Sequence, residues 1–145
     1  MSNAVVREIL PDGSVVLRTP GCTFTYRRPK PGVLVVTITG DDDGQFGTAT
    51  LDEIRMELLR ERPLALFIDA RAATGAAVSV SDDWKRFFEQ SRADLASVVV
   101  LAPSKFVHLT VQIAKHLSRT GELIEILSAP AAFEDRLRKT VPPPR

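Results

Sequence analysis

The chain has 145 residues, of which 44% are hydrophobic, enough for one domain with a continuous core. Its formal net charge of +1 argues against any general attraction to nucleic acid or to an anionic membrane surface. The single cysteine, Cys22, permits no internal disulfide, no apolar run approaches the ~20 residues of a spanning helix, and no signal peptide opens the chain, so we expect a cytoplasmic protein.

The first third of the chain predicts β-hairpins. Residues 5–10 and 14–18 flank Pro11-Asp12-Gly13, a turn sequence in which proline presets φ and glycine tolerates a positive φ. A second turn over 19–21 precedes a strand over 23–28, where apolar and polar residues alternate. We therefore expect an N-terminal β-hairpin extension over residues 1–21.

Four βα units follow between Gly32 and Arg138. Their strands are expected at 33–39, 64–69, 97–102 and 123–127, and a helical pattern follows each one. The alternation predicts an α/β fold whose mostly parallel or mixed sheet carries packed helices. We place this α/β domain at residues 22–138 and a proline-rich tail at 139–145.

The helices have recognisable starts and apolar faces. Thr50 and Glu53 form a capping-box pattern, and the stripe that follows them contains Leu51, Ile54, Leu58 and Leu59. A loop of small residues is expected over 70–80, after which Ser79 or Ser81 would cap the next helix. Trp84, Phe87 and Phe88 then have helical spacing and should lie in the core.

Acidic residues gather where strands are expected to end. Asp41, Asp42 and Asp43 follow one strand, Asp69 ends the next, and Ser104 with Lys105 follows the third. Partners and ligands often bind at this edge of an open sheet, although solvated turns and helix caps explain the same acids. The pattern partly matches a receiver domain with a Mg²⁺ site, but Asp69 ends the second parallel strand, whereas the phosphoacceptor of a receiver ends the third.

The chain contains no recognisable catalytic constellation. It has neither a P-loop nor a G-x-S-x-G elbow, and His108 and His116 are two helical turns apart, too far to share a metal without other ligands. Cys22 has no histidine nearby in sequence to activate it. The basic residues at 27, 28 and 30 are interpreted as a solvated strand end. We therefore expect no catalytic residues, no metal and no cofactor.

The layout resembles the STAS domain, the fold of anti-sigma factor antagonists. The local match is Gly40 followed by Thr50-Leu-Asp-Glu-Ile-Arg55, and the resemblance spans roughly 22–137. In detail it is similar to the divergent SpoIIAA-like branch, in which a strand ending in aspartate leads through a loop containing glycine to a helix with an early tryptophan. Asp69, Gly75 and Trp84 fit that description.

One departure from the family pattern concerns its phosphorylated serine. Signalling STAS domains carry Asp-Ser-Ser-Gly before the second helix, where this chain has Ala72-Ala73-Thr74-Gly75. Ser79 and Ser81 could substitute, because a phosphate at a helix N-terminus is favoured by free amides and the helix dipole. Asp82 and Asp83 would repel that phosphate, and a serine can also cap a helix with no further role.

The resemblance implies a non-enzymatic bacterial regulatory domain that binds a protein partner. The expected docking residues are Asp41, Asp42, Asp43, Gln45, Phe46, Ser81 and Asp82. Phe46 is either a core residue or an exposed anchor, and the core is favoured. The alternatives are a small apolar ligand or lipid-binding domain, with a cavity between the sheet and the helices of Trp84 and Phe106, and a degenerate receiver-like domain. A homodimer is compatible with the pattern.

Overall fold

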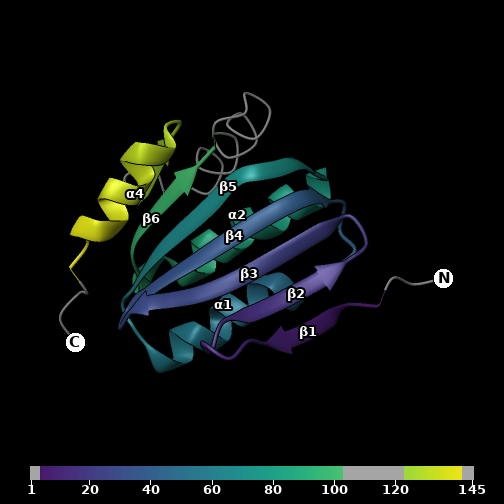
Figure 1. The fold of residues 1–145 in the computed structure, drawn as a ribbon, viewed down its shortest axis with the longest axis horizontal. Coiled ribbons are helices and arrows are strands. Elements are labelled where there is room, and N and C mark those ends of the chain that lie inside the picture. Colours follow the sequence, from purple (N-terminus) through teal and green to yellow (C-terminus); the bar gives the residue numbers. More distant parts are fainter. Residues whose placement is uncertain (1–3, 103–122, 142–145) are drawn as a thin grey trace.

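The structure is a computed structural model in which residues 4–102 and 123–141 are described. Within these residues, seven strands form a single sheet, and their spatial order is the same as their order in the chain (Figure 1). The strands are β1 (Val6–Ile9), β2 (Val15–Thr19), β3 (Cys22–Lys30), β4 (Val33–Asp42), β5 (Leu64–Ala76), β6 (Leu95–Leu101) and β7 (Ile124–Leu127).

The sheet is mixed, with an antiparallel half and a parallel half. Strands β1 to β4 pair antiparallel, whereas β4 to β7 pair parallel. The predicted α/β class and the N-terminal hairpins are therefore confirmed, and β1 and β2 continue the same sheet. A receiver domain has the strand order 2-1-3-4-5, with a switch point where the order reverses. The consecutive order found here has no such point, and this topology overturns the receiver-like alternative.

The described helices cover both faces of the sheet. Helices α1 (Ala49–Arg60) and α2 (Val78–Ser91) lie on one face, and α4 (Pro130–Lys139) lies on the other, next to β6 in Figure 1. A short 3-10 helix over Arg92–Asp94 connects α2 to β6. No helix among the described residues is long and apolar enough to cross a membrane. The helix predicted around Phe106 falls outside the described residues.

Strand β4 is apolar throughout its first half because the sheet is buried on both sides there. Leu34 and Val36 belong to the core beneath α1 and α2, whereas Val33 and Val35 belong to the core beneath α4. The α2 side of the larger core is filled by Phe87 and Phe88, both almost fully buried. The smaller core is closed by Phe133 of α4.

Two details of α1 differ from the sequence-based expectation. Thr50 lies inside the helix, where it is buried, and its carbonyl accepts a 2.7 Å hydrogen bond from the Tyr26 hydroxyl. The predicted capping box therefore does not form: the N-cap is Thr48, without a side-chain hydrogen bond, and Glu53 pairs with Arg7. Leu59, expected in the apolar stripe, is 76% exposed, since the helix turns that position toward solvent.

Strand β5 is longer than the sequence indicated. Residues predicted as a loop of small side chains continue the strand to Ala76, because their backbone pairs with the end of β4, from Thr39↔Ala72 to Asp42↔Ala76. Helix α2 then begins at Val78, so Ser79 and Ser81 lie inside it and neither is its cap. Composition favoured a loop here, and pairing with a neighbouring strand outweighed it.

Candidate functional site

The ends of β4 and β5 bring the β4–α1 loop against the start of α2. The amide of Ala77, the residue before α2, donates a 2.9 Å hydrogen bond to the carbonyl of Asp42. A methyl group placed on Gly44 would lie 3.8 Å from the Ser79 hydroxyl oxygen. The loop and the first turn of α2 were the two regions that the sequence linked, and they are adjacent in the structure. We refer to residues 41–45 together with Ser79 and Asp82 as the loop–helix surface.

Asp42 is the buried anchor of this loop. It is only 5% exposed, and its Oδ1 accepts a 3.1 Å hydrogen bond from the amide of Gly44. Burial raises the pKa of its carboxyl group, and the neighbouring charges of Asp43 and Asp41 raise it further, although the Gly44 hydrogen bond acts in the opposite direction. Asp42 therefore shapes the loop from inside and is not itself available to a partner.

Gln45 closes the loop from the other side. Its Oε1 accepts a 2.7 Å hydrogen bond from the amide of Asp43, and its Nε2 donates a 2.9 Å bond to the carbonyl of Asp41. The loop is thereby tied to itself at both ends. The side chains of Asp41 and Asp43 remain exposed on its outside. The result is a preorganised loop that presents two carboxylates to solvent.

Phe46 does not belong to the exposed surface. It is buried in the larger core, and its ring meets that of Phe24 edge to face with 5.2 Å between the centroids. Of the two roles open from the sequence, the core role is the one found. The structure thus removes Phe46 from the docking residues, because a side chain held between sheet and helix cannot reach a partner.

The two serines of α2 differ in accessibility. Ser79 is exposed, whereas Ser81 is half-buried and its hydroxyl donates a 3.5 Å hydrogen bond to the carbonyl of Ala77. The N-cap residue Ala77 provides no side-chain hydrogen bond to the helix. Asp82, the residue after Ser81, is exposed. Ser79 is therefore the more open of the two hydroxyl groups at this helix start.

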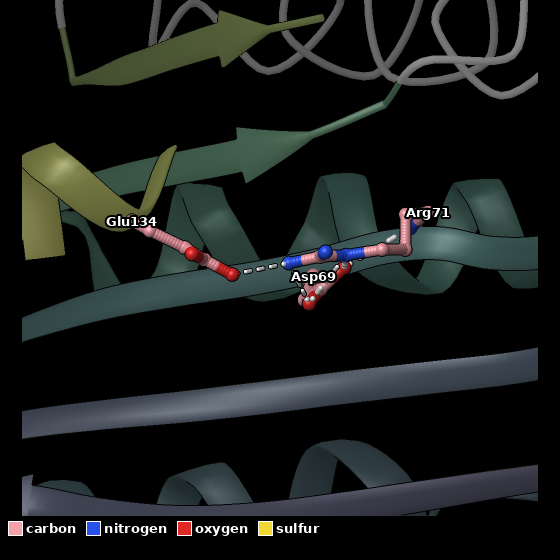
Figure 2. A network of polar contacts seen from close by, with 3 residues as sticks. All are labelled: Asp69, Arg71 and Glu134. Atoms are coloured by element: carbon pink, nitrogen blue, oxygen red, sulfur yellow. Dashed lines mark hydrogen bonds and ion pairs between the residues drawn. The ribbon is translucent and has the colours of Figure 1, made fainter. Parts of the chain in front are cut away.

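Asp69 lies away from the loop–helix surface and takes part in a separate network (Figure 2). Its carboxylate accepts hydrogen bonds of 3.1 Å from the backbone amide and the Nε of Arg71, and Arg71 reaches on to Glu134 of α4 at 3.2 Å. The network fastens β5 to the helix that covers it. Sequence reasoning missed Arg71 and Glu134, although positions 69 and 71 share a face of a strand.

The described part of the chain offers no metal centre and no activated thiol. No group of three or more potential metal ligands occurs among the described residues, and Ser104 and Lys105 lie outside them. Cys22 is buried, and burial, followed by the charges of Asp42 and Asp41, raises the pKa of its thiol to about 12. A thiol with that pKa is a poor nucleophile at neutral pH.

No protein-family model matches the chain, and no curated protein sequence matches it. Solved structures do match. An anti-sigma factor antagonist from Mycobacterium paratuberculosis aligns over 91% of this chain and 100% of its own, with a TM-score of 0.54 and 18% identity. The anti-sigma factor antagonist SpoIIAA in its unphosphorylated form aligns over 81% of this chain and 98% of its own, with a TM-score of 0.50 and 15% identity.

These structural matches define the class of fold. The chain has the STAS fold, that of the anti-sigma factor antagonists, as the resemblance of its sequence predicted. At identities of 18% and 15% the likeness concerns the fold, and function has to be argued from the surface.

Proposed function

We propose that this chain is a regulatory domain of the anti-sigma factor antagonist type, which acts in the bacterial cytoplasm by binding a protein partner and not by catalysis. The observation that carries the proposal is the hydrogen bond from Ala77 to Asp42, which holds the β4–α1 loop beside the start of α2. Docking on this loop–helix surface would order few groups, so little entropy would be lost on binding.

The chemistry of the surface suggests the kind of partner. Three carboxylates are exposed on it, those of Asp41, Asp43 and Asp82. The hydroxyl group of Ser79, in the first turn of α2, lies near Gly44 of the loop. Carboxylates of this kind favour a partner face with arginine or lysine side chains, which would speed association and orient the complex. The partner we propose is an anti-sigma factor that presents such a basic face.

Phosphorylation could regulate the same surface. Ser79 is exposed in the first turn of α2, where the helix dipole favours a phosphate. The added charge would lie close to Gly44 and to the exposed carboxylates of the loop. We propose that such a phosphate weakens docking because its repulsion of the neighbouring acids displaces the loop from the start of α2, an effect that outweighs the added attraction to a basic partner. Ser81 is the less accessible alternative.

Binding to purified anti-sigma factors tests the proposal directly. The anti-sigma factors of the host are expressed one by one and their binding is measured by biolayer interferometry. We expect at least one to bind, and we expect the pair Asp43→Lys with Asp82→Lys to weaken its affinity by about tenfold or more, since charge reversal at an interface costs several kcal/mol. Ser79→Glu should also weaken the affinity, although it adds a negative charge, because its carboxylate would displace the loop from the start of α2.

A matched control separates this surface from general charge effects. Asp52→Lys reverses one exposed aspartate on α1, the same charge change as Asp43→Lys or Asp82→Lys made singly, and should leave the affinity unchanged. Failure of every anti-sigma factor to bind would refute the proposed class of partner. Binding that ignores the Asp43 and Asp82 changes would show that another surface docks.

A further inference from the structure

A second candidate site lies at the other end of β4, at the turn between β3 and β4. A groove of about 370 Å³ opens there between this turn and the last turn of α1. It is lined by Arg28, Pro29, Lys30, Pro31, Gly32, Val33, Glu57, Arg60 and Glu61. A smaller hollow of about 160 Å³ shares three of these residues, namely Arg28, Glu57 and Arg60. Neither touches the loop–helix surface.

Glu57 is the unusual residue of the groove. It is only 8% exposed, yet among the described residues its carboxylate accepts no hydrogen bond. Its only partners there are Arg28 at 3.6 Å and Arg60 at 4.0 Å, both beyond hydrogen-bond distance. A carboxylate has room for about four hydrogen bonds, and no side-chain oxygen among the described residues is both fully buried and without a hydrogen bond, so the Glu57 oxygens remain accessible from the groove.

The N–H groups of the two arginines are likewise not used in hydrogen bonds within the described part of the chain. Arg28 and Arg60 form those long ion pairs with Glu57 and no hydrogen bond from either guanidinium within the described part of the chain, although each has five N–H groups. Lys30 differs, because its ammonium group already donates to the carbonyls of Leu137, Arg138 and Thr140. The groove therefore offers one buried acceptor between two uncommitted planar donors.

We propose that this groove binds a free α-amino acid as its zwitterion. The ammonium group of the ligand would donate to the Glu57 carboxylate, and its carboxylate would accept from the guanidinium groups of Arg28 and Arg60. Neither long ion pair uses the hydrogen-bonding capacity of these groups, so each can bond to a ligand that lies beside them, and charge-assisted hydrogen bonds are the stronger kind.

Ligands of a single charge fit this arrangement less well. A simple anion would meet the arginines but would bring a second negative charge against the buried carboxylate of Glu57. A simple cation would satisfy Glu57 but would be repelled by Arg28 and Arg60. Only a ligand that carries both charges, on two groups attached to the same carbon, complements all three groups. The exposed prolines Pro29 and Pro31 of the lining can contact its side chain.

Isothermal titration calorimetry with defined probes tests the proposal. The free protein amino acids are titrated one at a time at millimolar concentration into the whole chain. For any that binds, its N-acetyl derivative lacks the ammonium charge and its amide lacks the carboxylate charge. We expect both derivatives to bind more weakly, by about tenfold or more, because each leaves one charged partner of the groove unsatisfied.

Variants of the chain locate the site. Glu57→Gln and Arg28→Gln should each lower the affinity for the amino acid by a similar factor. Arg60→Gln should do the same, and because Arg60 is more exposed its replacement carries little risk to folding. The control pair Asp52→Asn and Arg55→Gln removes an ion pair of 3.0 Å from the same helix and should leave binding unchanged. Circular dichroism confirms that each variant is folded.

Three results would overturn the proposal. The first is that no free amino acid binds. The second is that acetate or inorganic phosphate binds as well as the amino acid does, which would make the groove a simple anion site. The third is that binding survives in folded Glu57→Gln, which would remove the ammonium contact on which the choice of ligand rests.

Discussion

Ala77 donates its backbone amide to the carbonyl of Asp42 at 2.9 Å, so the residue that opens α2 is fixed to the residue that ends β4. The side chain of Asp42 turns back into the loop and accepts the amide of Gly44. One residue therefore holds both halves of the loop–helix surface, through its backbone on one side and its carboxylate on the other. The ionisation of Asp42 is consequently linked to the stability of this region.

Asp42→Asn should stabilise the protein at neutral pH. Burial and nearby charges raise the pKa of Asp42, so the folded state favours its protonated form. The stability that this form contributes is present below the unfolded pKa, near 3.8, and is lost as the pH rises through the folded value. Asparagine keeps the acceptor for Gly44 without the charge. The gain over wild type in urea denaturation should therefore shrink as the pH is lowered through the raised pKa toward 3.8.

The control for this measurement is Asp52→Asn, whose side chain is exposed on α1. Its difference from wild type shows the effect of the same chemical change at an exposed position and is subtracted at each pH. A gain for Asp42→Asn that stays constant or grows as the pH falls would contradict the assigned direction of the pKa shift.

Gly40→Ala should be much more destabilising than a comparable glycine change elsewhere. Gly40 has a φ of +93°, and an added Cβ would lie 2.0 Å from the carbonyl oxygen of Gly21, a backbone atom that cannot move aside cheaply. Gly13 has a similar φ of +89° with nothing within 4 Å. Gly13→Ala should cost about 1–2 kcal/mol from backbone strain alone. Gly40→Ala should cost clearly more in the free energy of unfolding, and equal losses would show that the close approach to Gly21 is relieved easily.

The sequence predicted the sheet better than the boundaries of its elements. The apolar run at the start of β4 is buried on both faces, which is the property that the run indicated. The extension of β5 through 70–76 was missed, because alanine and glycine have low strand propensity and only pairing with β4 makes them a strand. The capping box at Thr50 failed for a similar reason, since a tertiary hydrogen bond from Tyr26 holds that residue inside α1.

The aromatic residues of α2 should contribute unequally to stability. Trp84, Phe87 and Phe88 were all expected in the core, but only the two phenylalanines are buried, and Trp84 packs half-buried against both of their rings. Phe87→Ala should therefore cost about 3–5 kcal/mol of unfolding free energy. Trp84→Ala should cost less, about 1–3 kcal/mol, because part of its surface already contacts water. A larger loss for Trp84→Ala in urea denaturation would contradict this assignment.

Some residues of the candidate site could be predicted from the sequence and others could not. Asp41, Asp43 and Ser79 could be grouped because strand ends and helix starts meet at one edge of a sheet. The buried state of Asp42 could not be foreseen, since one turn residue among three aspartates looks like its neighbours until the loop closes over it. Glu57 was also missed: an acid on a helix face is usually solvated, and only the fold places it in a groove.

Lys30→Met should loosen the C-terminal end of α4. The ammonium group of Lys30 donates to three carbonyls there, those of Leu137, Arg138 and Thr140, at 2.9–3.0 Å. The last carbonyls of a helix lack partners within the helix, so a cation that binds them stabilises the end. Methionine retains the aliphatic length of lysine and removes only the donors. We expect a loss of about 1–2 kcal/mol and faster hydrogen exchange at the amides of α4.

Lys139→Met provides the matched control for this change. Lys139 lies on α4 itself and pairs with Asp135 at 3.0 Å, but its side chain is 75% exposed, and exposed pairs contribute little. Hydrogen exchange of residues 130–139 should therefore respond to Lys30→Met and hardly at all to Lys139→Met. If the two variants accelerated exchange equally, α4 would depend on its own surface charges. If neither did, packing of Phe133 beneath the helix would suffice to hold it, and the link from the β3–β4 turn to α4 would carry no stability.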